Sequence, residues 1–116
     1  MRLNIKGIID RGVPNKERVH IFASQPANLS YYVLMEAQSA GMNQVHSGGH
    51  LSYWFGATTV NYGDHVILYT RPGTDNSVRR KDGFMNYFFY WGLNRTIWNN
   101  DQTRAVLFEL QSWLAD

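Results

Sequence analysis

The chain of 116 residues contains no cysteine. This absence excludes disulfides, thiolate zinc sites and a cysteine nucleophile, and it fits a reducing compartment better than a small secreted scaffold. The sequence also lacks an apolar run near the length of a membrane span. Its N-terminal apolar stretch is interrupted by Lys6, Gly7 and Asp10, which is not the pattern of a signal peptide. We therefore expect a cytoplasmic protein with no membrane partner.

The sequence has little excess charge of either sign, with a formal net charge of +2. The excess lies in one segment, 71–83, where Asp75 and Asp82 oppose four basic residues: Arg71, Arg79, Arg80 and Lys81. Such a patch attracts phosphate, and a solvated loop explains it equally well. Because specific DNA binding usually engages roughly 6–10 phosphates, this cluster predicts at most weak, salt-sensitive binding of nucleic acid.

Recognisable catalytic and metal-binding motifs are missing. The chain has no Gly-x-Ser-x-Gly motif and no glycine-rich phosphate loop before a helix, and its acidic residues are scattered. His46 and His50 are four residues apart, but the two glycines between them argue against a helix. His20 and His65 would have to meet that loop in space, with Asp64 as a further ligand. We expect no catalytic residue, no metal site and no cofactor.

The sequence is rich in short β-branched and aromatic segments separated by Gly, Pro, Asn and Asp, which indicates an all-β domain. Seven strands are predicted: Leu3–Ile9, Arg18–Ala23, Tyr32–Ala37, Leu51–Phe55, His65–Thr70, Met85–Trp91 and Ala105–Glu109. In a chain of this length they favour a sandwich or small barrel formed by one domain, 1–116. The polar, glycine-rich segment 38–50 is interpreted as a long connecting loop, with at most a short irregular strand.

The C-terminal segment 101–116 fits two structures. Apolar residues follow helical spacing, with Asn100 or Asp101 available as N-cap: Val106, Leu107, Leu110, Trp113 and Leu114. Val106, Phe108 and Leu110 also alternate as they would in a strand. The pattern alone leaves helix and strand with hairpin open.

One segment, MNYFFYWGL, contains five aromatic residues. Strand alternation sends Tyr87, Phe89 and Trp91 to one face, and it sends Phe88 and Tyr90 to the other. Because both faces are aromatic, we predict that the outer side is covered by a loop, a partner or a second subunit. Phe88 and Tyr90 are therefore the candidate protein-interface residues. Exposed rings would also suit a sugar, although a sandwich core needs this aromatic area inside.

Three segments, in the expected order, resemble the lamin tail domain. The most specific is Phe89–Glu109, FYWGLNRTIWNNDQTRAVLFE, in which Trp-Asn-Asn is followed by a turn and a strand. The matching residues are Trp91, Trp98, Asn99, Asn100, Ala105 and Leu107. The other two segments are YGDHVILYT, Tyr62–Thr70, and ERVHIFASQPANLSYYVL, Glu17–Leu34. The chain departs from the family at Gln102-Thr103, where Gly-Asp is usual, at Tyr31-Tyr32, where Gly-Trp is usual, and at Ala23, where Asn is frequent.

The resemblance implies an immunoglobulin-like β-sandwich of about seven to nine short, mostly antiparallel strands, and it favours a strand near the C-terminus. It also implies a non-catalytic interaction module, because the family motif is structural. Asn99 and Asn100 are expected to organise a turn through side-chain hydrogen bonds. We expect a protein partner or a second copy. Weak nucleic-acid binding is the runner-up, and carbohydrate binding or a small hydrolase is less favoured.

Overall fold

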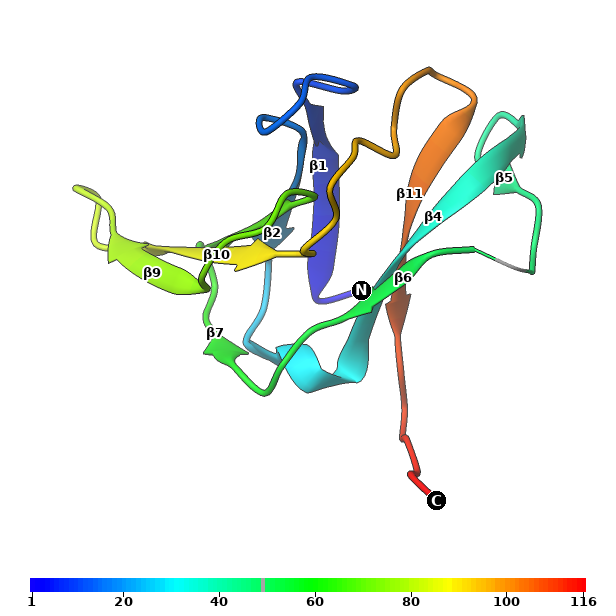
Figure 1. Ribbon diagram of the computed structural model, residues 1–116. Coiled ribbons are helices and arrows are strands. Elements are labelled where there is room, and N and C mark those ends of the chain that lie inside the picture. Colours follow the sequence, from blue (N-terminus) through cyan, green and yellow to red (C-terminus); the bar gives the residue numbers. More distant parts are fainter. Residues whose placement is uncertain (49) are drawn as a thin grey trace.

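The computed structural model describes residues 1–48 and 50–116, and these residues form an all-β fold (Figure 1). The described chain contains one short 3-10 turn, η1 at Leu29–Tyr31, and no helix with the length and apolar character to cross a membrane. Its strands are β1 (Leu3–Ile9), β2 (Arg18–Ala23), β3 (Ala27–Asn28), β4 (Tyr32–Gly41), β5 (Gln44–Val45), β6 (Ser52–Trp54), β7 (Thr59–Val60), β8 (His65–Tyr69), β9 (Asn76–Arg79), β10 (Met85–Tyr90) and β11 (Thr103–Glu109).

The strands form two main sheets. The first contains five strands in the order β1-β2-β8-β10-β9. The second is built on β4, which pairs with β11 along one side and with β6 and β5 along the other. Strands β3 and β7 form a separate two-stranded ribbon. All pairs are antiparallel except β8 with β10, so the prediction of an all-β, mostly antiparallel fold is confirmed.

The seven predicted strands are all present, and β1 and β2 have the predicted bounds. Four further strands, β3, β5, β7 and β9, did not stand out in the sequence. Strands β3, β5 and β7 have two residues each, which is too short for an alternating pattern. Strand β9 is mostly polar, so it also lacks the alternation of apolar residues that predicts a strand. The described part of the chain thus has eleven strands rather than seven to nine.

Two segments differ from their first interpretation. The long loop predicted for 38–50 is wrong at its start, because β4 continues past Ala37 to Gly41. The chain then turns through Asn43, with φ +57°, into the two-residue strand β5, which agrees with the short strand that the prediction allowed. The helical alternative for 101–116 is also wrong. Strand β11 pairs with β4 from Thr103 to Glu109, and this ladder of backbone hydrogen bonds replaces the bonds that an isolated helix would form.

The two sheets pack across an aromatic core. Phe55, which follows β6, meets Phe89 of β10 edge to face, with ring centroids 5.3 Å apart. Tyr53 of β6 contacts Trp91 at 5.8 Å, and Trp91 in turn meets Trp98 at 5.9 Å. Trp98 is fully buried. Such edge-to-face contacts add to the large apolar area that each ring removes from water, and they hold the second sheet against the first.

A buried carboxylate fixes the connection between β10 and β11. Glu17 immediately precedes β2 and is 0% exposed. Its carboxylate accepts hydrogen bonds from the backbone N–H groups of Gly12 at 2.8 Å, Ile97 at 2.9 Å and Trp98 at 3.1 Å. One acidic side chain therefore satisfies three backbone donors from two connections that are far apart in sequence.

Glu17→Gln is expected to lower the free energy of unfolding by about 3 kcal/mol. Glutamine offers one neutral acceptor oxygen in place of two charged ones, and its amide N–H groups would face backbone donors. Urea unfolding measures the change. Glu36→Gln, at a half-buried position in β4, is the matched control and should change stability by less than about 0.5 kcal/mol. Equal losses in both variants would contradict the role given to Glu17.

Candidate functional site

The aromatic strand β10 has the two faces that alternation predicts. Phe89 lies in the core, and Tyr87 and Trp91 pack against the core. Phe88 and Tyr90, the candidate interface residues, point to the outer face of the five-stranded sheet, and both are half-buried. The surroundings of the two residues differ.

Tyr90 lies beneath the connection between β8 and β9. Because β10 lies between these two strands in the sheet, their connection, 70–75, crosses the end of β10. The Tyr90 ring stacks on Tyr69 with centroids 5.4 Å apart and an interplanar angle of 10°. Gly73 lies against the same ring, where an added Cβ would be 2.4 Å from Cδ1. At this end, the outer side of β10 is covered by a loop, which is one of the three covers expected.

Phe88 instead lines a pocket on the same outer face, with a volume of about 390 Å³. Ile67 and Tyr69 of β8 share its lining. Two cations also line it, Arg18 from β2 and Arg80 from the turn after β9. We call this the outer pocket. It combines apolar and aromatic surface with guanidinium groups.

A histidine pair also lines the outer pocket. His20 Nε2 and His65 Nδ1 are 2.5 Å apart, so one imidazole donates to the other. Burial lowers the pKa of both rings. The pKa of His20 is lowered further by His65, Arg18, Arg80 and Lys6, in that order. For His65, Arg80 and Lys6 also lower the pKa, against the opposing effect of Asp82 and Asp64.

The histidines do not assemble with a carboxylate into a metal-like cluster. Asp64 is nearly buried, and its carboxylate accepts from the backbone N–H groups of Met85 at 2.9 Å and Asn61 at 2.8 Å. His46 and His50 belong to the connection beyond β5, where His50 Nε2 lies 3.0 Å from the His46 carbonyl oxygen. Among residues 1–48 and 50–116, no three His, Asp or Glu side chains gather in a ligand-like group.

The basic cluster expected to attract nucleic acid is divided between the two ends of β10. The Arg71 guanidinium lies 4.9 Å from the Tyr90 ring centroid, at the C-terminal end of the strand. Arg79 is the last residue of β9, and Arg80 and Lys81 lie in the turn that leads into the N-terminal end of β10. Arg80 pairs with Asp82 at 2.9 Å, and Arg79 donates to the Gly83 carbonyl at 3.0 Å. The structure therefore does not bring the four cations into one contiguous patch.

The residues of the Trp-Asn-Asn motif stabilise the chain between β10 and β11. Trp98 Nε1 donates to the Arg104 carbonyl at 3.0 Å. Asn100 Oδ1 accepts from the backbone N–H of Gln102 at 2.8 Å. The Asn99 side chain accepts a hydrogen bond from the Thr96 hydroxyl through Oδ1, and it donates one to the Thr96 backbone carbonyl through Nδ2. These contacts close the turn that leads into β11.

An exposed aromatic surface on the second sheet was missed in the sequence. Pairing places Trp54, Val33 and Phe108 in one row across β6, β4 and β11. The next row contains Met35 and Val106. We call the face formed by these five residues and Trp113 the tryptophan face. Since Leu34, between Val33 and Met35, is 0% exposed in the core, both rows point outward.

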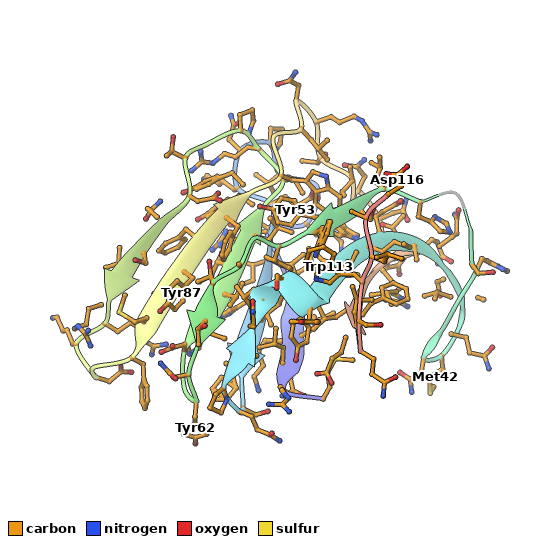
Figure 2. The ribbon with its side chains drawn as sticks, turned by 90° about the horizontal axis from the view of Figure 1, so that it is seen from below. Met42, Tyr53, Tyr62, Tyr87, Trp113 and Asp116 are labelled. Atoms are coloured by element: carbon orange, nitrogen blue, oxygen red, sulfur yellow. The ribbon has the colours of Figure 1, made fainter. Side chains whose placement is uncertain are left out.

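The aromatic side chains of this face are about half exposed. Trp54 is 52% exposed, Trp113 is 49% exposed and Phe108 is 41% exposed. The indoles of Trp54 and Trp113 meet edge to face, with centroids 4.9 Å apart, and Figure 2 shows Trp113 on the C-terminal segment beside the second sheet. Strand alternation in β11 could have indicated Phe108. The positions of Trp54 and Trp113 depend on tertiary contacts.

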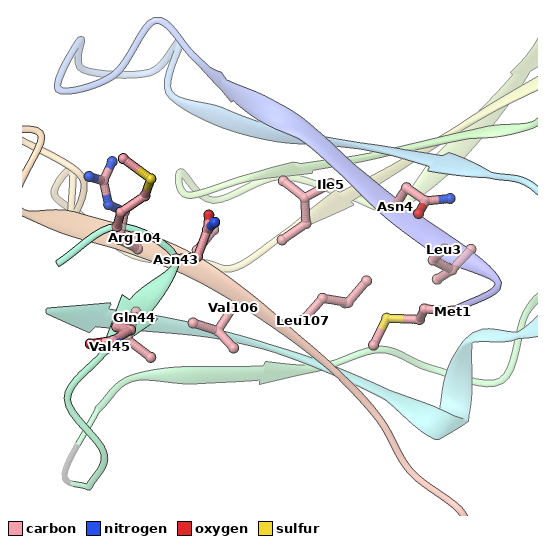
Figure 3. A pocket seen from close by; sticks show the side chains of 12 residues that line it. Met1, Leu3, Asn4, Ile5, Asn43, Gln44, Val45, Arg104, Val106 and Leu107 are labelled. Carbon is pink, nitrogen blue, oxygen red and sulfur yellow. The ribbon is translucent and has the colours of Figure 1, made fainter. Parts of the chain in front are cut away.

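A groove of about 680 Å³ separates the outermost strands of the two sheets, β1 and β11 (Figure 3). Ile5 and Leu107 face it from opposite sides. Met42 and Val45 of the β4–β5 hairpin also line it. Among its described lining residues, Arg104 carries the one side-chain charge. The described lining of the groove therefore contains no carboxylate or imidazole that could act as a general acid or base.

Comparison of the chain with protein-family models, curated proteins and solved structures finds no match. The resemblance to lamin tail domains therefore stays a hypothesis carried by the quoted segments. The features that carry an argument about function are the outer pocket, the tryptophan face and the groove.

Gly73→Ala is expected to destabilise the protein by about 1–3 kcal/mol, because the added methyl group would overlap the base of the Tyr90 ring. Chemical denaturation measures the loss, and near-ultraviolet circular dichroism reports displacement of the ring. Gly56→Ala is the matched control, since an added Cβ at Gly56 meets nothing within 4 Å. If both variants are equally stable, the covering loop does not press on Tyr90.

The histidine pair is expected to make stability fall as the pH drops from about 7.5 to about 5.5. The folded pKa values lie below the ordinary value of 6.5, so the unfolded chain takes up protons first. The stabilisation is present above pH 6.5 and is lost as the pH falls through the folded values. Thermal unfolding across this range measures it. A double variant, His20→Gln with His65→Gln, should flatten the profile, and an unchanged slope would refute this assignment.

Proposed function

We propose that the protein is a cytoplasmic, non-catalytic interaction module that pairs with a second copy of itself through the tryptophan face. The observation that carries the proposal is the joint exposure of Trp54, Phe108 and Trp113 on one sheet face. Large exposed apolar patches on soluble proteins are typical of interaction sites. Tryptophan is also among the residues that contribute most to protein interfaces.

The arrangement of the rings favours a protein partner over a sugar. Sugar recognition uses an aromatic ring whose flat face is presented to the ligand. The planes of Trp54 and Trp113 are inclined at 80°, so the two indoles do not form one flat platform. Val33, Met35 and Val106 extend the apolar surface between and beside the rings, which suits the interdigitating side chains of a second protein surface.

Charge favours a second copy as the partner. The tryptophan face is formed by uncharged side chains, so two copies meeting face to face bring no like charges together there. The net charge of the whole chain is only +2, which gives weak repulsion between copies. A standard interface takes about 800 Å² from each partner, roughly a tenth of the 7094 Å² surface of this protein. A two-fold pair of standard size would therefore bury about that fraction of each copy.

The lamin-tail resemblance supports the same proposal. We infer an immunoglobulin-like arrangement of the sandwich, in which Glu17 and Trp98 from two of the matched segments meet through a hydrogen bond of 3.1 Å. This hydrogen bond between two matched residues stabilises the fold. That role fits a family motif made of structural residues rather than catalytic ones. Nucleic-acid binding through Arg71, Arg79, Arg80 and Lys81 stays a prediction, with those cations at two ends of β10.

Phe108→Lys is the variant that tests self-association. It should convert a dimer into a monomer, because two-fold pairing would bury a lysine close to its copy without a counter-charge. Sedimentation equilibrium from low micromolar to near-millimolar concentration measures the mass. Val78→Lys is the matched control, since Val78 is 53% exposed on β9 of the other sheet. It should leave the dimer intact.

Two results would overturn the proposal. A monomeric wild-type protein over the whole concentration range would rule out self-association. A dimer that survives Phe108→Lys but is lost in Val78→Lys would place the interface on the five-stranded sheet, next to Phe88, instead of on the tryptophan face.

A further inference from the structure

The outer pocket on the five-stranded sheet is separate from the tryptophan face on the second sheet. Its cations come from two places in the sequence, Arg18 on β2 and Arg80 in the turn between β9 and β10. The histidine pair belongs to two adjacent strands of the sheet, His20 to β2 and His65 to β8. The fold therefore brings two guanidinium groups and two imidazoles together in the lining of one pocket.

Both arginines keep donors for a further partner. Arg18 uses Nη1 for Asp10, at 2.8 Å, and for the Lys16 carbonyl, also at 2.8 Å. Arg80 uses Nη2 for Asp82. A guanidinium has five N–H donors on three nitrogens, and the side chains of Arg18 and Arg80 are 27% and 33% exposed. Each can therefore donate to a ligand while it remains paired.

The local electrostatics favour an anion beside the histidine pair. Lys6, Arg18 and Arg80 all disfavour a charged His20, and Lys6 and Arg80 disfavour a charged His65. The carboxylates that oppose this effect at His65 belong to Asp82 and Asp64. Asp64 is committed to two backbone donors, and Asp82 is shared with Arg80. A bound oxyanion would oppose the effect that these cations have on the two imidazoles.

The apolar part of the lining limits the kind of anion. Phe88, Tyr69 and Ile67 lie next to the cations, and an aromatic group can pack on them while an attached oxyanion faces the guanidinium groups. Asn86, which lies on the same side of β10 as Phe88, adds an amide group that can donate or accept a hydrogen bond. This combination suits a phosphate monoester whose organic group is aromatic.

We propose that the outer pocket is a binding site for an aromatic phosphate monoester, with the phosphoryl group held by Arg18 and Arg80 beside the His20–His65 pair and the aromatic group on Phe88. Binding takes up a proton at the histidine pair, because the anion favours the imidazolium form. Affinity for a fixed dianion therefore rises as the pH falls. The proposal does not depend on self-association, since Phe88 and the tryptophan face belong to different sheets.

Sulfate is the first probe, because it remains a dianion across the pH range in which histidine titrates. Calorimetric titration at constant ionic strength, kept with chloride, should give tighter binding at about pH 5.5 than at about pH 7.5. The imidazole signals of His20 and His65 should shift in nuclear magnetic resonance spectra, while those of His46 and His50 stay fixed. At one pH, phenyl phosphate should bind more tightly than inorganic phosphate if Phe88 contributes.

Arg80→Gln should weaken sulfate binding by roughly tenfold or more. Arg79→Gln is the matched control, because Arg79 precedes Arg80 in the chain but bonds the Gly83 carbonyl and does not line the pocket. It should change affinity by less than about twofold. The thermal midpoint of each variant without ligand verifies that it is folded. Comparison of adenosine monophosphate with O-phosphotyrosine then distinguishes a nucleotide from a phosphorylated side chain as the natural source.

Three results would overturn the proposal. One is an absence of sulfate-dependent shifts at His20 and His65. Another is equal weakening by Arg79→Gln and Arg80→Gln, which would indicate general surface charge. The third is affinity for phenyl phosphate no greater than for inorganic phosphate, which would remove Phe88 and the aromatic ligand from the site.

Discussion

The Glu17 carboxylate is the interaction on which the arrangement of the two sheets depends. It lies at the start of β2 in the first sheet, and it holds the backbone of Ile97 and Trp98 on the connection that leads into β11 of the second. Because the site is fully buried, water cannot take over these bonds if the carboxylate is lost. Trp98 is fixed as a consequence, and its ring meets Trp91 in the core. The position of β11, and hence of Phe108 on the tryptophan face, follows from this anchor.

Strand order explains why the two outer faces differ. Strand β10 lies between β8 and β9, so the connection from β8 to β9 must cross its end, and Tyr90 is covered there by Gly73. Next to it on that face is the outer pocket, lined by arginine, histidine and the half-buried Phe88. The second sheet has short strands on one side of β4, and the six side chains that form the tryptophan face are uncharged. The first face thus suits an anionic ligand and the second an apolar partner.

Much of the fold could be predicted from alternating apolar residues. The bounds of β1 and β2 agree with the sequence pattern because both strands are rich in β-branched and apolar residues. The alternation is regular in β2, while a bulge between Ile5 and Gly7 interrupts it in β1. Strand β9 escaped prediction because all four of its residues are exposed and its pairing comes from β10. The helical spacing near the C-terminus was misleading, since helix and strand patterns both fit a segment whose state is set by its neighbour β4. Of the candidate sites, the pattern identified Phe88 but could not indicate that His20 would meet His65.

The sequence by itself determined the all-β class, the main strands and the two faces of β10, because these depend on local alternation and on turn residues such as Gly and Pro. The lamin-tail resemblance remains a hypothesis about family. Only the tertiary structure decided which side chains meet. The joining of Arg18, His20, His65 and Arg80 into one pocket, the cover over Tyr90 and the exposure of Trp54 beside Trp113 all depend on strand order and register. Those are properties of long-range pairing, which a local pattern does not specify.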